Sequence, residues 1–161
     1  MRKWRAVLLL VMIAGCVASD ALVQARPSRG RQYYSSWRHY GDRGYYYRTY
    51  YYTENADDSD DAYQYQYMIY YPSRPRYYYY YNPRSRKYWG RFDRESKGAD
   101  CYSILAEKDR KTDLKEIEES AFPKPAAMPG IPGAKDGVLM EQPPKDPPEE
   151  DKGPPKDARK G

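Results

Sequence analysis

The sequence offers few residues that could carry out catalysis. His39 is the single histidine of the chain, and Ser35, Ser36 and Asp42 lie near it. A serine hydrolase of the common α/β type places its nucleophile in a Gly-x-Ser-x-Gly turn after a strand, and no such turn surrounds these serines. We therefore interpret His39 as an incidental solvent-exposed residue and predict that the protein is not an enzyme.

Patterns that bind a metal ion or a phosphate are also missing from the sequence. The cysteines and the histidine lack the spacing of a zinc site, and no glycine-rich loop precedes a helix. The stretch TENADDSDDA at 53–62 carries five acids, but it lacks the central glycine and closing glutamate of an EF-hand loop. It is predicted to be a solvated acidic linker, and no cofactor or metal ion is expected.

The first 25 residues have the features of a secretory signal peptide. A basic start is followed by thirteen small or apolar residues at 6–18, too few for a membrane span of roughly 20 residues. Cleavage after Ala25 fits the small residues there. A competing interpretation is the lipobox-like Ile-Ala-Gly-Cys, in which Cys16 is lipidated and anchors the protein to a membrane. Either route predicts export to the periplasm, envelope or exterior.

The composition of residues 26–161 predicts a mostly disordered chain. Leu, Ile, Val and Phe together number only ten there, far below the level of roughly 20% that marks disorder-prone chains. Tyrosine is the exception, because all 21 tyrosines lie between Tyr33 and Tyr102. Their rings carry apolar area, but each hydroxyl needs water or a partner, so a small, shallow core is expected. Cys101 would be the single cysteine left after cleavage, which excludes a disulfide within the chain.

Changes of composition divide the chain into four predicted segments. Residues 1–25 are the signal peptide, and residues 26–61 are a disordered segment, first rich in Arg, Gly and Tyr and then acidic. Residues 62–122 are a small β module. Residues 123–161 hold ten of the 14 prolines and are predicted to be a disordered, extended spacer.

Within the β module the sequence predicts an antiparallel meander and a short helix. Short aromatic or β-branched runs separated by turn-forming clusters indicate strands over about 63–107, and YQYQY has the period-2 alternation of a strand with one wet face. At 113–121 Asp113 can cap a helix, with Glu116 in the capping-box position. A helix this short is marginal alone, so it would pack on the meander.

The run of five tyrosines at 77–81 is predicted to be a strand with a packed face and a wet aromatic face. Breakers and charges on both sides restrain an aggregation-prone segment. In the following strand, alternation places Tyr88, Gly90 and Phe92 on one side and Trp89 and Arg91 on the other. The candidate interaction surface consists of Tyr77, Tyr79, Tyr81, Trp89 and Arg91.

Over about 77–140 the chain contains the stretches YYYNPRSRKYWGRFD, YSILAEKDRK, AFPKP and GIPGAKDGV. In these stretches it resembles small exported tyrosine-rich proteins of planctomycete-type bacteria. In that group a tyrosine-rich stretch leads into a Tyr-Trp-Gly-Arg strand, a Leu-Ala-Glu-Lys-Asp-Arg-Lys segment and a proline-rich tail. The resemblance implies that 77–122 is a module defined by Tyr88–Arg91 and Ile104–Lys111, and it implies no catalytic or binding residues.

These observations favour a structural or interaction protein of the cell envelope or exterior. Tyrosine and arginine surfaces can adhere to envelope or extracellular polymers, or to other copies of the chain, through aromatic and cation–π contacts. Single-stranded nucleic-acid binding is the alternative, because arginine and tyrosine suit phosphate contact and base stacking. It is disfavoured by the predicted export and by the acidic stretch, which repels phosphate. Contact with a membrane is expected only through a lipid at Cys16.

Overall fold

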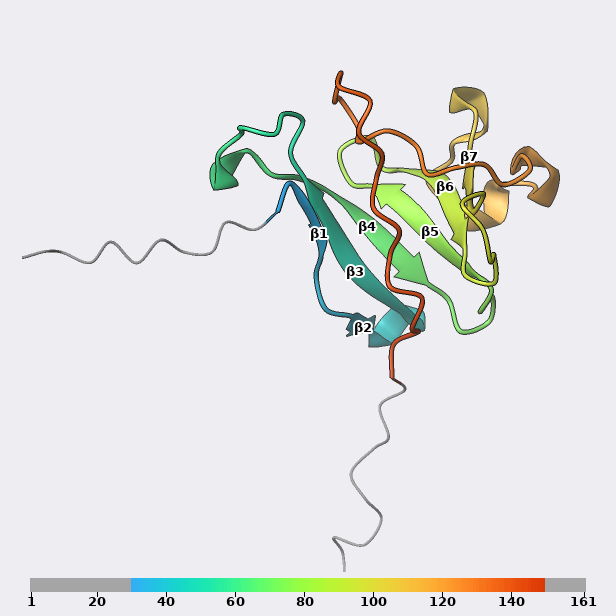
Figure 1. Cartoon of the computed structure of the whole chain (residues 1–161). Coiled ribbons are helices and arrows are strands. Elements are labelled where there is room, and N and C mark those ends of the chain that lie inside the picture. The colour runs from blue at the N-terminus through green and yellow to red at the C-terminus, as the bar shows by residue number, and fades with distance from the viewer. Residues whose placement is uncertain (1–29, 150–161) are drawn as a thin grey trace, which may run out of the picture.

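The computed structural model describes residues 30–149, which contain one antiparallel sheet of seven strands (Figure 1). The strands follow the order β1-β3-β4-β5-β6-β7, and β2 pairs with β3 beyond the end of β1. Their bounds are β1 Gln32–Tyr34, β2 Arg38–Tyr40, β3 Tyr45–Tyr52, β4 Gln64–Tyr70, β5 Tyr77–Asn82, β6 Lys87–Asp93 and β7 Tyr102–Ile104. Tyrosine suits these positions, because aromatic side chains pack well on a pleated surface.

Turn chemistry sets the register of the five-tyrosine strand. After β5, the Asn82 side-chain oxygen accepts hydrogen bonds from the amides of Arg84 and Ser85 at 2.9 and 3.1 Å, as in an Asx turn. Arg86 closes the connection with a φ of 56°. The pairing of β5 with β6 then shifts, so that Tyr81 faces Tyr88 whereas Tyr80 faces Gly90.

This shift leaves Trp89 without a partner opposite it, as in a β-bulge. The bulge changes the alternation on β6, because Tyr88 and Arg91 both oppose residues of the same face of β5, Tyr81 and Tyr79. The prediction that Tyr88 lies on the side opposite Arg91 is therefore wrong. Simple alternation fails here because the extra residue offsets the period of two.

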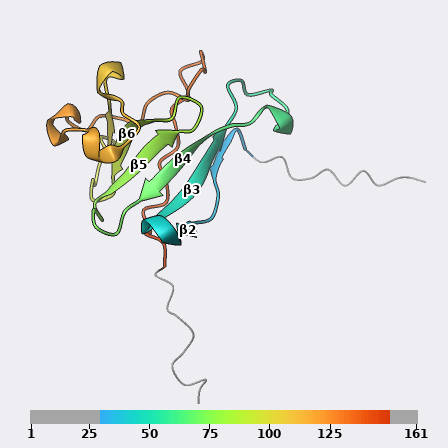
Figure 2. The same ribbon diagram turned by 180° about the vertical axis from the view of Figure 1, so that it is seen from behind.

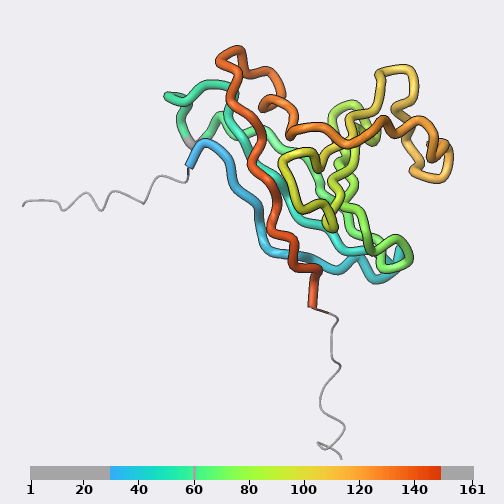
Figure 3. The backbone as a smooth tube through the Cα atoms, turned by 45° about the vertical axis from the view of Figure 1, so that its right-hand side comes forward, coloured from blue at the N-terminus to red at the C-terminus, as the bar shows by residue number. Residues whose placement is uncertain are grey.

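The two faces of the sheet pack against different segments. One face contributes Tyr50, Met68, Tyr78, Tyr80 and Phe92 to a buried cluster with Met128, Ile131 and Met140 from the C-terminal part. That C-terminal segment crosses the strands in both Figure 1 and Figure 3. The other face contributes a cluster that includes Ile69, Tyr79, Tyr88, Leu114, Ile117 and Phe122. Figure 2 shows that the turns supplying the last three lie beside β6, away from β3.

The helix predicted at 113–121 is not formed. Two 3₁₀ turns, η4 Leu114–Glu116 and η5 Glu119–Ala121, stand there instead. Asp113 does cap, since its carboxylate accepts a hydrogen bond from the Lys115 amide at 2.9 Å. The backbone then becomes extended at Ile117 and Glu118 (ψ 113° and 140°). The remaining short turns are η1 Gly41–Arg43, η2 Asp60–Ala62 and η3 Glu107–Asp109.

The prediction of a mostly disordered chain with a small meander is wrong. Strands β4 to β7 do lie within 63–107, but they are part of a larger sheet, whose first three strands fall within 26–61. Tyrosine forms much of the core. Tyr50 and Tyr80 are fully buried, and their rings supply the apolar area that the few aliphatic residues of the chain cannot provide. Residues 123–149 pack on this sheet. Residues 26–29 and 150–161, and the predicted signal peptide, lie outside the described residues.

Replacing one buried polar side chain of the core with an apolar residue should raise the stability of the protein. Gln66 on β4 is fully buried, and neither atom of its amide has a hydrogen-bond partner among residues 30–149. A buried amide without a partner costs about 1–3 kcal/mol. We expect Gln66→Met, which conserves volume, to raise the free energy of unfolding by about 1 kcal/mol in a urea titration. A loss of stability would show that the amide is hydrogen-bonded in solution.

Candidate aromatic binding face

The 3₁₀ turns cover only the β6 side of the second sheet face. The rest of that face carries a set of tyrosines on adjacent strands, which we call the open face. Its members on β3 and β4 share one side of the sheet, because Tyr47 pairs with Ile69 and Tyr51 pairs with Tyr65. The register extends this side to Tyr33 on β1 and Tyr81 on β5. The open face comprises Tyr33, Tyr45, Tyr47, Tyr51, Tyr65, Tyr67 and Tyr81, with Tyr40 at its border.

Ring contacts make the open face continuous from β1 to β4. Tyr33 stacks on Tyr51 with ring centroids 4.8 Å apart, and Tyr51 lies 6.2 Å from Tyr65. Tyr67 then contacts both Tyr65 and Tyr47 at 5.6 Å. Such pairs contribute about 0.5–1.5 kcal/mol each beyond the area they bury. They also fix each ring in place, so the face is a preformed platform of tyrosines.

A groove of about 670 Å³ lies at one end of the open face. Its size falls within the range of ligand sites, about 300–1,000 Å³. A second hollow of about 280 Å³ shares Tyr47 and Tyr67 with it, so the two adjoin. The groove is lined by Tyr40, Arg43, Tyr45, Tyr47, Tyr67, Ile69, Tyr71, Tyr81, Arg86, Tyr88, Thr112, Asp113 and Lys115.

Three separate loops bring charged side chains to the groove. The turn η1 supplies Arg43, whose guanidinium lies 5.8 Å from the ring centroid of Tyr40, and Gly44 ends that turn with a φ of 63°. The β5–β6 connection supplies Arg86, and the loop around η4 supplies Lys115 and Asp113. None of the three cations forms an ion pair with another described residue. The groove therefore has a net positive charge.

Four phenols of the groove are held in the neutral form by partial burial. Burial is the main cause that raises the pKa of Tyr45, Tyr67, Tyr71 and Tyr88 above the ordinary value of 10.0. The hydroxyls of Tyr71 and Tyr88 also lie 2.7 Å apart and share a hydrogen bond. Neutral hydroxyls can both donate and accept hydrogen bonds. The groove thus combines flat apolar rings, hydroxyls and cations, a combination that can bind a polar ligand.

The residues predicted as an interaction surface occupy different environments. Tyr81 lines the groove, whereas Tyr79 is 1% exposed. Arg91 is also buried, with its guanidinium 3.9 Å from the ring centroid of Tyr77 and 4.1 Å from that of Phe122. An ion pair of 2.6 Å joins it to Glu119. Arg91 therefore fastens η5 to the sheet.

Trp89, the fifth member of that predicted surface, is the residue of the bulge. Its ring is half-buried beneath Arg110, whose guanidinium lies 5.1 Å from the ring centroid. Of the five residues, only Tyr81 is among those that line the groove.

Most of the open face was not predicted as a site. The tyrosines of β3 lie in a segment that composition marked as disordered. A usable signal was present in YQYQY, whose alternation places Tyr65 and Tyr67 on the same wet side of β4. That signal does not reveal which other strands stand beside β4, since pairing depends on the whole topology.

The structure gives the residues considered for catalysis no common site. The His39 ring stacks on Tyr46 at 4.5 Å, and the Ser35 hydroxyl donates to the Ser36 carbonyl instead of contacting His39. Among residues 30–149 no three His, Cys, Asp or Glu side chains gather as a metal site requires. Nor does that part of the chain contain a helix long and apolar enough to cross a membrane.

Of the two cysteines, Cys101 lies within the described residues and is buried in the core. Cys101 is a buried free thiol that donates to the Ala99 carbonyl at 3.2 Å, and burial raises its pKa. It is therefore a packed core residue rather than a reactive one. Cys16, predicted as a lipidation site, lies outside the described residues.

Comparisons with known proteins leave the geometry as the basis for assigning function. Searches against protein-family models, curated proteins and solved structures find no significant match to this chain. The resemblance to planctomycete-type proteins stays a prediction. What the structure establishes is a seven-stranded antiparallel sheet that presents a tyrosine face with a cationic groove.

Proposed function

We propose that this protein is a non-enzymatic interaction protein of the cell envelope or exterior, and that its open face binds an anionic polysaccharide. The carrying observation is the groove, in which tyrosine rings lie beside three cations that have no ion-pair partner within residues 30–149. Location outside the cytoplasm rests on the signal-like N-terminus.

The aromatic part of the groove supports a sugar polymer as ligand. The flat faces of sugar rings expose C–H groups, which stack on aromatic rings while the ring hydroxyls form hydrogen bonds at the edges. Tyr40, which lines the groove, and Tyr65, which lines the adjoining hollow, are both 44% exposed, so each offers a ring to a ligand. A row of such rings fits an extended chain better than a single small molecule.

The charged part of the groove supports an acidic sugar. Arg43, Arg86 and Lys115 outnumber Asp113, and charge complementarity of this kind favours a partner of opposite sign. A carboxylate on a uronic acid would meet these cations while its ring stacks on tyrosine. The same features would suit single-stranded nucleic acid, so that ligand is included in the test.

Binding to immobilised polygalacturonate tests this proposal, with cellulose and a single-stranded oligonucleotide as competitors. We expect Tyr40→Ala and Tyr65→Ala each to weaken binding about tenfold, because a lost stacking contact of about 1.4 kcal/mol corresponds to that factor. The control is Tyr46→Ala, since Tyr46 lies on β3, which pairs with the strands of both Tyr40 and Tyr65, but on the opposite side of the sheet, beside Tyr70. That variant should bind normally.

The charge requirement has its own variant. Replacing both Arg86 and Lys115 with Gln should weaken binding to polygalacturonate and reduce its dependence on salt. Equal binding to cellulose would show that charge plays no part. Preference for the oligonucleotide would establish the nucleic-acid alternative, and no binding to any of the three polymers would overturn the proposal.

A further inference from the structure

The face opposite the open face holds an extended segment of the chain itself. Residues 139–148, which we call the strap, cross the strands there (Figures 1 and 3). Apart from a single bridge between Leu139 and Gly130, the strap forms no strand pairing with the part of the chain that the structure describes. Its hydrogen bonds run instead to side chains of the sheet and its edges.

The sheet recognises the strap through backbone carbonyls. The Tyr34 hydroxyl donates to the Glu141 carbonyl at 2.8 Å, and the Tyr78 hydroxyl lies 3.1 and 2.9 Å from the carbonyls of Lys145 and Asp146. Further bonds to strap carbonyls come from Gln32 Nε2, Arg94 Nε and Trp37 Nε1, at 3.0, 3.1 and 3.4 Å.

Burial along the strap follows its prolines. Pro143 and Pro148 are buried, while the charged residues between them are exposed. Aromatic grooves that bind proline-rich peptides share these features: rings that receive prolines, and ring hydroxyls or indole N–H groups that bond the peptide carbonyls. Proline-rich chains suit such sites because they are already extended and lose little entropy on binding.

Charge also matches between the strap and the sheet surface beneath it, which we call the strap site. The Arg48 guanidinium lies 4.6 Å from the Trp37 ring centroid, and that of Arg94 lies 5.1 Å from Tyr78. Both cations belong to the floor beneath the strap. The strap carries Glu141 and Asp146 against the single cation Lys145. This complementarity favours proline-rich segments of net negative charge.

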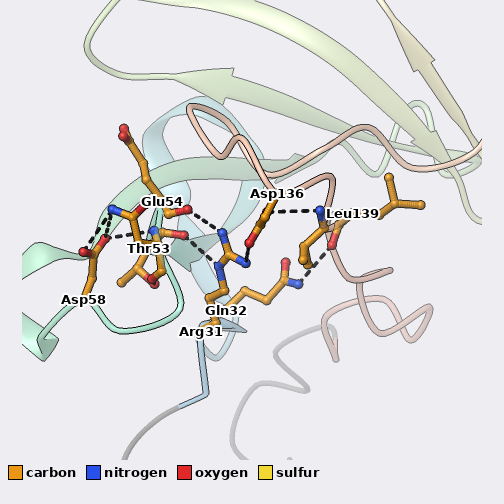
Figure 4. A network of polar contacts seen from close by, with 9 residues as sticks. Arg31, Gln32, Thr53, Glu54, Asp58, Asp136 and Leu139 are labelled. Carbon is orange, nitrogen blue, oxygen red and sulfur yellow. Dashed lines mark hydrogen bonds and ion pairs between the residues drawn. The ribbon is translucent and has the colours of Figure 1, made fainter.

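The chain enters the strap from a fixed loop. Before it, the loop 131–138 is held by an ion pair between Arg31 and Asp136, and Arg31 also bonds the carbonyls of Thr53 and Glu54 (Figure 4). Gly133 packs so closely on Glu54 that a Cβ there would lie 2.5 Å from that side chain. The loop is therefore fixed and gives the strap a defined starting point. A strap from a second copy would have to replace the buried contacts of Met140, Pro143 and Pro148.

We propose that the strap site binds acidic proline-rich segments, and that it exchanges its own strap for the strap of a second copy of the chain. The contacts are the same whether the strap belongs to the same chain or to another, which makes such exchange a low-cost route to assembly. The Pro-Pro-Lys-Asp sequence at Pro143 recurs at Pro154, outside the described residues. The site lies across the sheet from the open face, so it is independent of polysaccharide binding.

Cross-linking of two single-cysteine variants tests strap exchange. The full chain carries Cys16→Ser in every variant. Ser96→Cys then labels the edge of the strap site and Lys145→Cys labels the strap. The two positions are close, because the Lys145 ammonium donates a hydrogen bond to the Ser96 carbonyl. Neither side chain donates any of the hydrogen bonds to strap carbonyls described above. Cys101 is buried and should not react with the cross-linker. With a short bismaleimide, a chain carrying both substitutions should form an intrachain cross-link, which verifies the geometry.

A mixture of the two single variants should yield cross-linked heterodimer. The intrachain strap competes at an effective concentration of about 1 mM, so the yield should rise with protein concentration up to that value. An excess of a peptide with the sequence of residues 139–149 should suppress it, and the same peptide with alanine in place of its prolines should not. Heterodimer no more abundant than the homodimer background at about 1 mM, or insensitive to the peptide, would overturn the proposal.

Discussion

Raising the pH above 10 is expected to unfold this protein cooperatively, with a midpoint at about pH 11. Tyr50, Tyr80, Tyr88 and Tyr102 are at most 6% exposed, and burial is the main cause that raises their pKa values above the ordinary 10.0. Above pH 10 the unfolded chain releases these protons while the folded chain keeps them. Stability is therefore complete below the unfolded pKa and is lost as the pH rises beyond it.

The size of this effect follows from the number of buried phenols. Each contributes a loss of about 1.4 kcal/mol per pH unit above 10, so the four together lose about 6 kcal/mol by pH 11. That is comparable to the entire stability of a small domain, about 5–15 kcal/mol. An aliphatic core would show no such loss, because it contains no group that titrates in this range.

Urea titrations across a pH series, followed by circular dichroism and by phenolate absorbance, would measure it. The exposed tyrosines should ionise gradually, and the buried ones together with the loss of the sheet. Tyr80→Phe removes one buried phenol, so its stability should fall less steeply above pH 10, by about 1.4 kcal/mol per unit. Smooth ionisation of all tyrosines with the sheet intact would contradict the expectation.

Gly90→Ala is expected to destabilise the sheet by about 3 kcal/mol. A Cβ at Gly90 would lie 2.6 Å from the Ser103 carbonyl oxygen and within 2.8 Å of two atoms of the Tyr102 side chain. The first is backbone and the second is a buried ring, so neither can move aside cheaply. Thermal melting should show a decrease in Tm of about 10 °C.

The matched control is Gly98→Ala, in the loop before β7. The nearest atom to a Cβ there is the Asp100 amide nitrogen at 3.9 Å, so the stability should stay within about 0.5 kcal/mol. If Gly90→Ala melted like Gly98→Ala, the close packing of Tyr102 over β6 would be disproved.

Prediction of the fold from sequence succeeded where the signal was local. The alternation in YQYQY and the breakers around the five tyrosines mark strands β4 and β5. It failed for β3, because a count of aliphatic residues treats tyrosine as polar, whereas Tyr50 and Tyr52 are buried. At 113–121 the capping pattern was read correctly at Asp113, but burial of Leu114 and Ile117 on the sheet outweighed a weak helical preference.

Prediction of the candidate site was limited by contacts between distant segments. Tyr81 was named from its place in β5, yet the groove also needs Tyr40 from the first strands and Lys115 from the last turns. Arg91 looked available because it alternates with buried residues, but Phe122 and Glu119 cover it. The role of the strap could not be read from its composition, since a spacer and a bound proline-rich segment have the same sequence features.

The ion pair between Arg31 and Asp136 joins residues 105 positions apart, which bears on the order in which the chain folds. The hairpins from β3 to β6 pair neighbouring segments and can form early, whereas contacts of such sequence separation form slowly. As the chain leaves the ribosome, Tyr50, Tyr78 and Tyr80 stay uncovered until residues 128–148 have been made. An unfinished chain thus exposes an aromatic surface of the kind that leads to aggregation, and a nonsense mutation before Met128 would make that state permanent.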